Sequence, residues 1–442
     1  MLIFPGHMPK SMQFVCNCAS QKIMTALMLM LILATGQAAQ VASAQEIFPL
    51  TLREAEELAL FDEPGQNSFL FRAAALRDKS VAGGQLPDPT MRIGMANFPI
   101  QSGGFTTEGM TQAQLGLRQV FPAGDKRELT TQKFRTLSDE MTQKANGRGR
   151  DVLTAVRTAW LETHFWREAH QITIKSRPFF DDLVTITRSL YAVGRKSQQD
   201  VLRADLELRR LDDRIIEMGK QHARARAALS QWVGEESTRP VASMMPEWTA
   251  VPPLEVLKTD LRGHPAMMAA DANVGASLVD VDLAKQEYKP DWALDLGFGY
   301  RDGFLSNGQA RSDFVSLSVT VDLPFFRSRR QDKSVGAALS ERRAADQSRE
   351  ELLRRLNSQL DAEYVRWQYL GRRLDLYEEL ILGVSADNAT AALAAYQSDT
   401  GDFADAMRGY VDDLNTRLDY IRLQVERAQS YAVLANLGGI PR

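Results

Sequence analysis

The chain has 442 residues, of which 44% are hydrophobic and 25% are charged, and its formal net charge at pH 7 is −3. This composition is too apolar for an intrinsically disordered chain, and its balanced charge argues against a nucleic-acid-binding protein. The two cysteines, Cys16 and Cys18, both precede residue 45, so the rest of the chain has no thiol for a disulfide, a lipid or a metal.

Residues 1–44 are predicted to be a signal peptide. The apolar run 23–33 follows Lys10 and Lys22 and ends before Ala42-Ser-Ala44, which predicts cleavage after Ala44. A short membrane anchor is the alternative, but about 11 apolar residues are too few to cross a ~30 Å hydrocarbon core as a helix. After residue 44 no apolar stretch is long enough for a spanning helix, so we expect any membrane-inserted part to consist of strands.

Strands are predicted where apolar and polar residues alternate. In the clearest segment, Val315, Leu317 and Val319 fall on one side, and Ser316 and Ser318 fall on the other. The predicted strands run at about 90–99, 111–121, 292–301 and 314–323. Each is long enough to cross a bilayer when tilted, although a soluble antiparallel sheet shows the same alternation. Because four strands cannot close a barrel, a membrane sheet would need oligomerisation, and three copies would give twelve strands.

Long helices are predicted between and after the strand pairs, at about 125–191, 196–234, 327–396 and 402–437. Apolar residues such as Leu353, Leu356 and Leu360 advance by three and four positions, and this repeat imposes left-handed supercoiling against a partner helix. An ordinary coiled-coil rod has the same repeat, but it would not alternate twice with amphipathic strands. Pro178 is expected to kink the first arm.

The chain is also duplicated. Tyr191-Ala-Val-Gly194 corresponds to Tyr396-Gln-Ser-Asp399, and Leu86-Pro-Asp88 corresponds to Lys289-Pro-Asp291. Such self-similarity predicts two equivalent halves, 45–240 and 263–442, which are joined by a linker at 241–262. Duplicated long helices argue against an enzyme.

These features together resemble the TolC family of outer-membrane efflux proteins. The resemblance lies in the strand exits 121–127 and 323–326, the Pro-Asp pairs at 87–88 and 290–291, and the Tyr-x-x-Gly turn at 191–194. It implies a homotrimer in the outer membrane, in which four strands per chain form a twelve-stranded transmembrane β-barrel. The barrel would continue into a periplasmic α-helical coiled-coil barrel, which docks to a periplasmic adaptor (membrane fusion) protein and an inner-membrane pump of RND type.

By this resemblance the turns at the ends of the helical hairpins contact the adaptor. The implied docking residues are Val193, Gly194, Arg195 and Ser197 in the first half and Asp399, Thr400, Gly401 and Phe403 in the second. The second turn departs from the pattern, because Asp399 stands where Gly194 stands in the first. Aspartate tolerates the left-handed backbone region better than most residues, so the turn is expected to survive.

The resemblance further implies an aperture just inside the turns. Asp405 aligns with the family's aperture aspartate, and Asp402 lies one turn earlier on the same helix face. Arg408 stands where the family often has a second aspartate, so it is a candidate ion-pair partner for Asp405. Asp200 is the equivalent of Asp405 in the first half. The alternative for each aspartate is a solvated helix face.

No catalytic, cofactor or metal site is predicted. The histidines His164, His170, His222 and His264 lack ligand spacing, and adjacent methionines such as Met244 and Met245 point apart, which disfavours a copper site. The predicted function is the passive exit duct of a tripartite efflux system. Segments 84–89, 94–99 and 121–127 resemble members that serve heavy-metal cation pumps. A drug-efflux or type I secretion duct and a soluble periplasmic coiled-coil scaffold are the alternatives.

Overall fold

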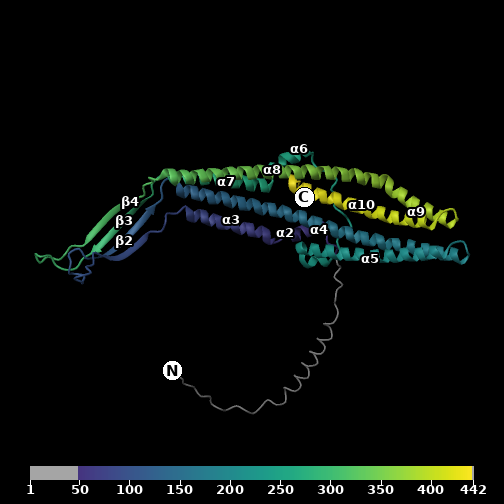
Figure 1. Cartoon of the computed structure of the whole chain (residues 1–442), viewed down its shortest axis with the longest axis horizontal. Helices are drawn as coiled ribbons and strands as arrows, with labels where there is room; N and C mark the ends of the chain where they lie inside the picture. The colour runs from purple at the N-terminus through teal and green to yellow at the C-terminus, as the bar shows by residue number, and fades with distance from the viewer. Residues whose placement is uncertain (1–47, 441–442) are drawn as a thin grey trace, which may run out of the picture. The chain divides into compact units, whose positions relative to one another are not determined.

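The computed structural model describes residues 48–440, and the predicted signal peptide lies outside them. Leu50–Arg442 form one compact unit, to which all the following elements belong (Figure 1). The elements of the first half are α2 (Leu52–Leu60), α3 (Pro64–Gly83), β1 (Thr90–Ala96), β2 (Gln112–Phe121), α4 (Lys126–Ala192) and α5 (Gln198–Val233). Those of the second half are α6 (Leu254–Asp260), α7 (Pro265–Gln286), β3 (Trp292–Tyr300), β4 (Phe314–Val321), α8 (Gln331–Leu376), α9 (Leu382–Gln397) and α10 (Phe403–Gly438). Apart from the short helices α2 and α6, each half therefore contains a helix, a strand pair and a long helical hairpin, in that order.

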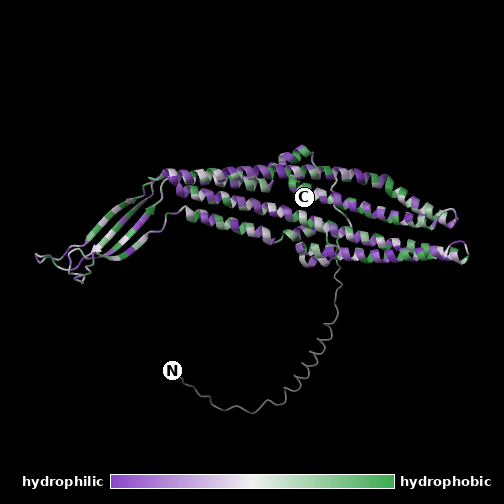
Figure 2. Ribbon diagram, viewed as in Figure 1, coloured by the Kyte–Doolittle hydropathy of each residue, from purple (hydrophilic) through white to green (hydrophobic). Residues whose placement is uncertain are grey.

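The four strands form one antiparallel sheet in the order β1-β2-β3-β4. The register sets Leu117 opposite Leu296 and Leu296 opposite Leu317, while Gly116 stands opposite Gly297 and Gly297 opposite Ser316. Because successive side chains of a strand point to opposite faces, the sheet has one apolar face and one polar face. Figure 2 shows the hydropathy alternating along the strands.

The apolar face of the sheet is exposed across all four strands. Among the exposed apolar side chains of this face, the exposed fraction runs from 37% at Leu294 to 74% at Ile93 and Val315. Gln119 is a polar residue on the same face. The exposed apolar members of the face are Met91, Ile93, Met95, Leu115, Leu117, Trp292, Leu294, Leu296, Phe298, Tyr300, Val315, Leu317, Val319 and Val321. A surface of this size and continuity is unusual for a protein domain that water surrounds on all sides.

The long helices lie side by side in a layer that extends away from the sheet (Figure 1). Helix α4 packs against α3, α5, α7 and α10, and α8 packs against α7 and α10. The two central helices of the hairpin region are therefore α4 and α10, with α5 and α9 at its outer edges. Within the described chain no helix is both long and apolar enough to cross a membrane.

The largest apolar core joins α2, α4, α5 and α10. Trp160 is fully buried at its centre, and its Nε1 donates a hydrogen bond to the carbonyl oxygen of Leu50 at 3.0 Å. Leu50 in turn forms a parallel bridge with Val241, and Trp248 stacks on Tyr431 with ring centroids 4.7 Å apart. The predicted linker 241–262 is thus held against the helices, and it contains α6.

The two helical arms differ in regularity. Helix α4 continues through Pro178 as one helix of 67 residues. In the second half the arm from Gln331 to Gln397 also has 67 residues, but a π-helical turn at Tyr377–Ile381 separates α8 from α9. The kink expected at Pro178 stays a prediction, because α4 keeps one helix type through that residue, and the π-helical turn lies in the other arm.

Candidate functional site at the helical hairpin ends

The first hairpin end is a tight turn between α4 and α5. Gly194 has a φ of +74°, and its N–H donates to the carbonyl oxygen of Tyr191 at 2.9 Å. The N–H of Arg195 donates to the carbonyl oxygen of Leu190, also at 2.9 Å. These bonds satisfy the last carbonyls of α4, and glycine adopts the required positive φ at little cost.

Helix α5 begins with a capping box. The N–H of Asp200 donates to Ser197 Oγ at 3.2 Å, and Asp200 Oδ2 accepts bonds from the N–H of Ser197 at 3.3 Å and from its Oγ at 2.9 Å. The carboxylate of Asp200, a predicted aperture residue, is therefore occupied in starting the helix.

The second hairpin end repeats this turn with a different residue. Asp399 has a φ of +68°, close to that of Gly194. The N–H groups of Thr400 and Gly401 both donate to the carbonyl oxygen of Ala395 at 3.0 Å. The two turns thus share one backbone conformation, and aspartate holds the left-handed position as expected.

A lysine from the first turn contacts the second. Lys196 Nζ lies 2.5 Å from Asp399 Oδ1 and 4.8 Å from the ring centroid of Tyr396. The hydrogen bond from Lys196 holds the pKa of Asp399 below its ordinary value, and the same bond raises the pKa of Lys196. Both groups are therefore charged across the neutral pH range, and their ion pair joins the two hairpin ends.

Aromatic side chains pack next to this ion pair. Tyr396 is 1% exposed, and its hydroxyl donates to Thr187 Oγ1 on α4 at 3.4 Å. Its ring meets Phe403 edge-on, with centroids 5.8 Å apart. Phe403, a predicted docking residue, is only 5% exposed, so in this structure it packs inside the hairpin and presents little surface to a partner.

The other predicted docking residues remain largely accessible. Val193 is 70% exposed, although it is apolar, and a Cβ atom added at Gly194 would meet no atom within 4 Å. Arg195, Ser197, Asp399 and Thr400 are exposed, and Gly401 is half-buried. The hairpin ends therefore offer small, apolar and charged groups to the outside.

The predicted aperture residues lie at the start of α10. Asp405 Oδ1 accepts a hydrogen bond from Arg408 Nη1 at 3.1 Å, and both side chains are more than half exposed. The pairing of Arg408 with Asp405, one of the two readings of the sequence, is thus present in the structure. Asp402 is the N-cap of α10, but its side chain makes no capping hydrogen bond.

Lys196 and Tyr396 are not among the site residues that the sequence predicts. Lys196 lies between two predicted docking residues, and Tyr396 opens the second turn motif, yet no local spacing pairs them. In residues 48–440 no cluster of three or more histidine, cysteine, aspartate or glutamate side chains is arranged to hold a metal. The buried His164 stacks on Trp160, and its Nδ1 lies 3.2 Å from the carbonyl oxygen of Ala242.

Similarity to known proteins identifies the fold to which these hairpins belong. No family model matches the sequence. The protein CyaE of Bordetella pertussis is 26% identical over 312 residues, which cover 66% of this chain and 65% of CyaE. The solved structure of the outer-membrane channel OprN is 18% identical with a TM-score of 0.73, and the alignment covers 88% of this chain and 90% of OprN.

The outer membrane protein VceC from Vibrio cholerae is 16% identical, again with a TM-score of 0.73, over 88% of this chain and 96% of VceC. The chain has a TolC-like fold. The predicted TolC-like fold class is therefore confirmed for the single chain, with its strand pairs and long helical hairpins each present twice. At these identities the structural likeness shows the fold, and the hairpin ends are the part of the TolC-like fold in which the predicted site residues gather.

Proposed function

We propose that the chain is one subunit of a passive duct that crosses the outer membrane and continues into the periplasm. The observation that carries this proposal is the apolar face of the sheet, which is exposed on all four strands. Such an apolar face is suited to contact with lipid, because lipid-facing and lumen-facing residues alternate along a membrane strand. A soluble periplasmic scaffold would leave this face in water.

The strands at both edges of the sheet need to pair with strands of further copies of the chain. Strands β1 and β4 each have one unpaired side, and unpaired backbone groups are very costly in hydrocarbon. Pairing β4 of one copy with β1 of the next closes the sheet, and three copies give twelve strands. A homotrimer is therefore the assembly that we propose.

The outer helices also carry apolar side chains that lack cover in the single chain. On α5, Ile216 is 72% exposed and Leu202 is 63% exposed. The second arm has a comparable series, with exposed fractions between 49% and 58%: Val365, Tyr369, Leu376, Leu380 and Val384. These edges are complementary in character, so α5 of one copy packing against α8 and α9 of the next would bury both.

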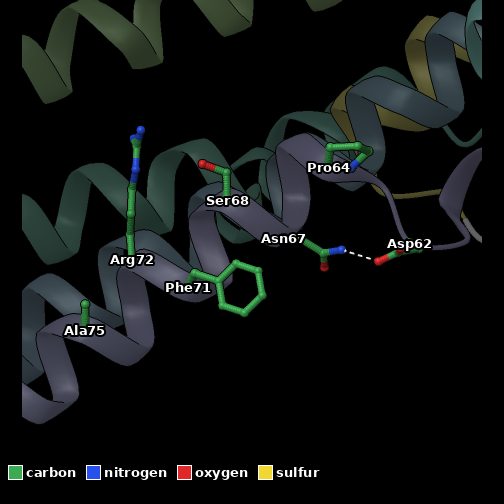
Figure 3. A pocket seen from close by; sticks show the side chains of 7 residues that line it. All are labelled: Asp62, Pro64, Asn67, Ser68, Phe71, Arg72 and Ala75. Atoms are coloured by element: carbon green, nitrogen blue, oxygen red, sulfur yellow. Dashed lines mark hydrogen bonds between the residues drawn. The ribbon is translucent and has the colours of Figure 1, made fainter.

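A shallow depression at the start of α3 adds to this uncovered surface. It is lined by Asp62, Pro64, Asn67, Ser68, Phe71, Arg72 and Ala75, as Figure 3 shows. Asn67 Nδ2 donates to Asp62 Oδ1 at 2.6 Å, and Phe71 is 74% exposed. An exposed phenyl ring on one helix face is again suited to contact with another polypeptide.

The polar face of the sheet would line the duct. Across it, Arg118 Nη1 lies 3.8 Å from Asp295 Oδ1, and Thr320 Oγ1 donates to Asp295 Oδ2 at 3.1 Å. Polar interiors of this kind conduct hydrated solutes without chemical change. The accessible hairpin ends are the surfaces that we assign to a periplasmic adaptor, and an inner-membrane pump, of RND type in our proposal, would supply the energy.

For the transported substrate we propose heavy-metal cations. This choice rests on the resemblance of segments 84–89, 94–99 and 121–127 to ducts that serve metal pumps. A drug-efflux or secretion duct of the same fold is the competing assignment. Deleting the gene and measuring growth on metal salts and on a drug panel separates them, because only the metal duct would shift metal tolerance alone.

Cell fractionation followed by bilayer recording tests the duct itself. We expect the mature protein in the outer-membrane fraction as a trimer that runs as a monomer only after boiling. The purified trimer should form ion-conducting channels in planar bilayers. Recovery as a soluble periplasmic protein would reject the duct in favour of a coiled-coil scaffold.

A further inference from the structure

The connection between β4 and α8 carries an unusual combination of side chains. We propose that this connection binds the phosphate groups of anionic glycerophospholipids at the membrane surface beside the sheet. The proposal rests on the proposed function, because it requires the sheet to be inserted in a bilayer. The end of this connection and the first turn of α8 are together called the β4–α8 segment below, which comprises residues 325–333, Phe-Phe-Arg-Ser-Arg-Arg-Gln-Asp-Lys.

The β4–α8 segment has no full counterpart in the other half of the molecule. In the first half, residues 123–125 connect Pro122 to the start of α4 at Lys126. In the second half, residues 325–330 connect Pro324 to the start of α8 at Gln331. Since the arms that follow have equal numbers of residues, the additional length lies in this connection.

The charges of the β4–α8 segment are mostly positive and uncompensated. Arg327, Arg329, Arg330 and Lys333 face a single acidic residue in the segment, Asp332, whose Oδ1 accepts a hydrogen bond from the hydroxyl of Tyr288 at 2.5 Å. Between residues 48 and 440, nothing lies within hydrogen-bond or ion-pair distance of the side chains of Arg329 and Arg330.

Two guanidinium groups without protein partners are available to an external anion. Arginine recognises phosphate particularly well, because its planar fork of N–H groups matches two phosphate oxygens at once. Zwitterionic headgroups also contain phosphate, but their ammonium groups cancel its charge. Clusters of arginine and lysine beside a membrane segment therefore favour anionic lipids.

Two aromatic rings accompany these charges. Phe325 is 77% exposed and Phe326 is 83% exposed, although both are large apolar side chains. The chain reaches them directly from the apolar face of the sheet through Leu323, which is 60% exposed. Apolar rings next to cationic groups suit the boundary between hydrocarbon and headgroups, where each can meet its preferred environment.

The position of the β4–α8 segment along the sheet agrees with a membrane surface. Val321, the last residue of β4, pairs with Trp292, and the Trp292 ring stacks on Phe121 with centroids 4.2 Å apart. Aromatic side chains of this kind mark the interface at the end of a membrane strand. The segment follows within a few residues, at the end of the sheet from which the helical arms extend (Figure 1).

The test uses the purified trimer of the full chain, reconstituted into vesicles of phosphatidylcholine alone or of phosphatidylcholine mixed with phosphatidylglycerol. The temperature at which the trimer dissociates is measured in both. We expect phosphatidylglycerol to raise it for the natural protein. The double variant Arg329→Gln with Arg330→Gln should lose at least half of this rise, and so should high salt.

The matched control is Arg354→Gln with Arg355→Gln. These two arginines are also adjacent and exposed, and they lie on α8 well away from the β4–α8 segment. The control removes the same charge from the same chain, so it should keep the full rise. An equal loss in both double variants would show a general effect of net charge and would overturn the proposal.

Two further outcomes would also overturn it. Phosphatidylglycerol could leave the dissociation temperature of the natural protein unchanged, or inorganic phosphate added to phosphatidylcholine vesicles could reproduce the whole rise, which would indicate a site for free anions. Channel conductance in pure phosphatidylcholine separates the two proposals. Normal conductance with no lipid effect rejects the lipid site alone, whereas failure to insert into either membrane rejects the duct and the lipid site together.

Discussion

Lys196 Nζ and Asp399 Oδ1 lie 2.5 Å apart, although the two residues belong to different halves of the duplicated chain. This ion pair is a direct side-chain link between the two hairpin turns of one molecule. The lysine ammonium group also lies over the ring of Tyr396, so the contact combines an ion pair with a cation–π interaction. Relative motion of the two turns must break it.

The pH dependence of this link follows from its two groups. The pKa of Asp399 is lowered by Lys196, so the contribution of the carboxylate is present above its ordinary pKa, near 4, and is lost as the pH falls through the lowered value. The pKa of Lys196 is raised, so its contribution is complete below its ordinary pKa, near 10, and is lost as the pH rises through the raised value. We predict that the protection of the amides at both turns, which is the intrinsic exchange rate divided by the observed rate at the same pH, is high throughout the neutral range and falls below about pH 4.

The variant Lys196→Gln should speed up exchange at both turns already at neutral pH. Lys220→Gln is the matched control, because Lys220 is an exposed lysine whose ion pair with Glu217 lies within α5. Lys196→Arg should restore slow exchange. If Lys196→Gln affected only the first turn, the ion pair would not couple the two hairpin ends.

The apolar face of the sheet gives a prediction about stability. Val319 belongs to that face and is 60% exposed, whereas its neighbour Ser318 points to the polar face opposite Asp295. Val319→Arg should destabilise the membrane-inserted trimer by about 2–4 kcal/mol if the residue lies near the bilayer midplane. Ser318→Arg should be tolerated. Heat-modifiable trimer yield in outer-membrane fractions measures both, and normal yield from Val319→Arg would contradict a lipid-facing β4.

The first hairpin turn gives a prediction about docking. Gly194→Val places a β-branched residue at a φ of +74°, which costs on the order of 1–3 kcal/mol and distorts the turn. We expect weaker binding of the adaptor and weaker efflux, with an unchanged amount of protein in the outer membrane. Asp399→Gly is the companion variant, because it keeps the left-handed turn while it removes the ion pair. Full efflux in Gly194→Val cells would show that this turn does not contribute to docking.

The start of α10 gives a prediction about ion selectivity. If copies of Asp405 converge on the axis of a trimer, Asp405→Ala should raise the conductance of the isolated channel and reduce its preference for cations. Arg408 forms an ion pair with Asp405, so Arg408→Ala should have the opposite effect on selectivity and increase the cation preference.

Asp200→Ala is the control for this pair of variants, because its carboxylate is engaged in the capping box of α5. It should change selectivity less than Asp405→Ala. If Asp402→Ala altered the channel and Asp405→Ala did not, the constriction would lie one turn nearer the hairpin end. Unchanged selectivity in all of these variants would exclude an acidic ring.

The sequence predicted those features that repeat over short distances. Alternation of residues such as Val315 to Val319 predicts a two-faced strand, and a glycine or aspartate between two helices predicts a left-handed turn. It did not predict the contact between Lys196 and Asp399, because side chains 203 positions apart are brought together only by the packing of α4 against α10. Nor did it predict that Phe403 is buried, because a large aromatic residue beside a turn can face either solvent or its own hairpin.

Because of the π-helical turn at Tyr377–Ile381, the two halves of the duplicated chain are not structurally equivalent. Both arms contain 67 residues, but a π turn holds one residue more than an α turn. The second arm is consequently shorter by about 1.5 Å, and beyond this turn its side chains are rotated by about 100° relative to those of the first arm. A ring of three chains would therefore have two kinds of hairpin alternating around its rim, with threefold rather than pseudo-sixfold equivalence. Any protein that binds to that rim would contact two distinct sets of sites.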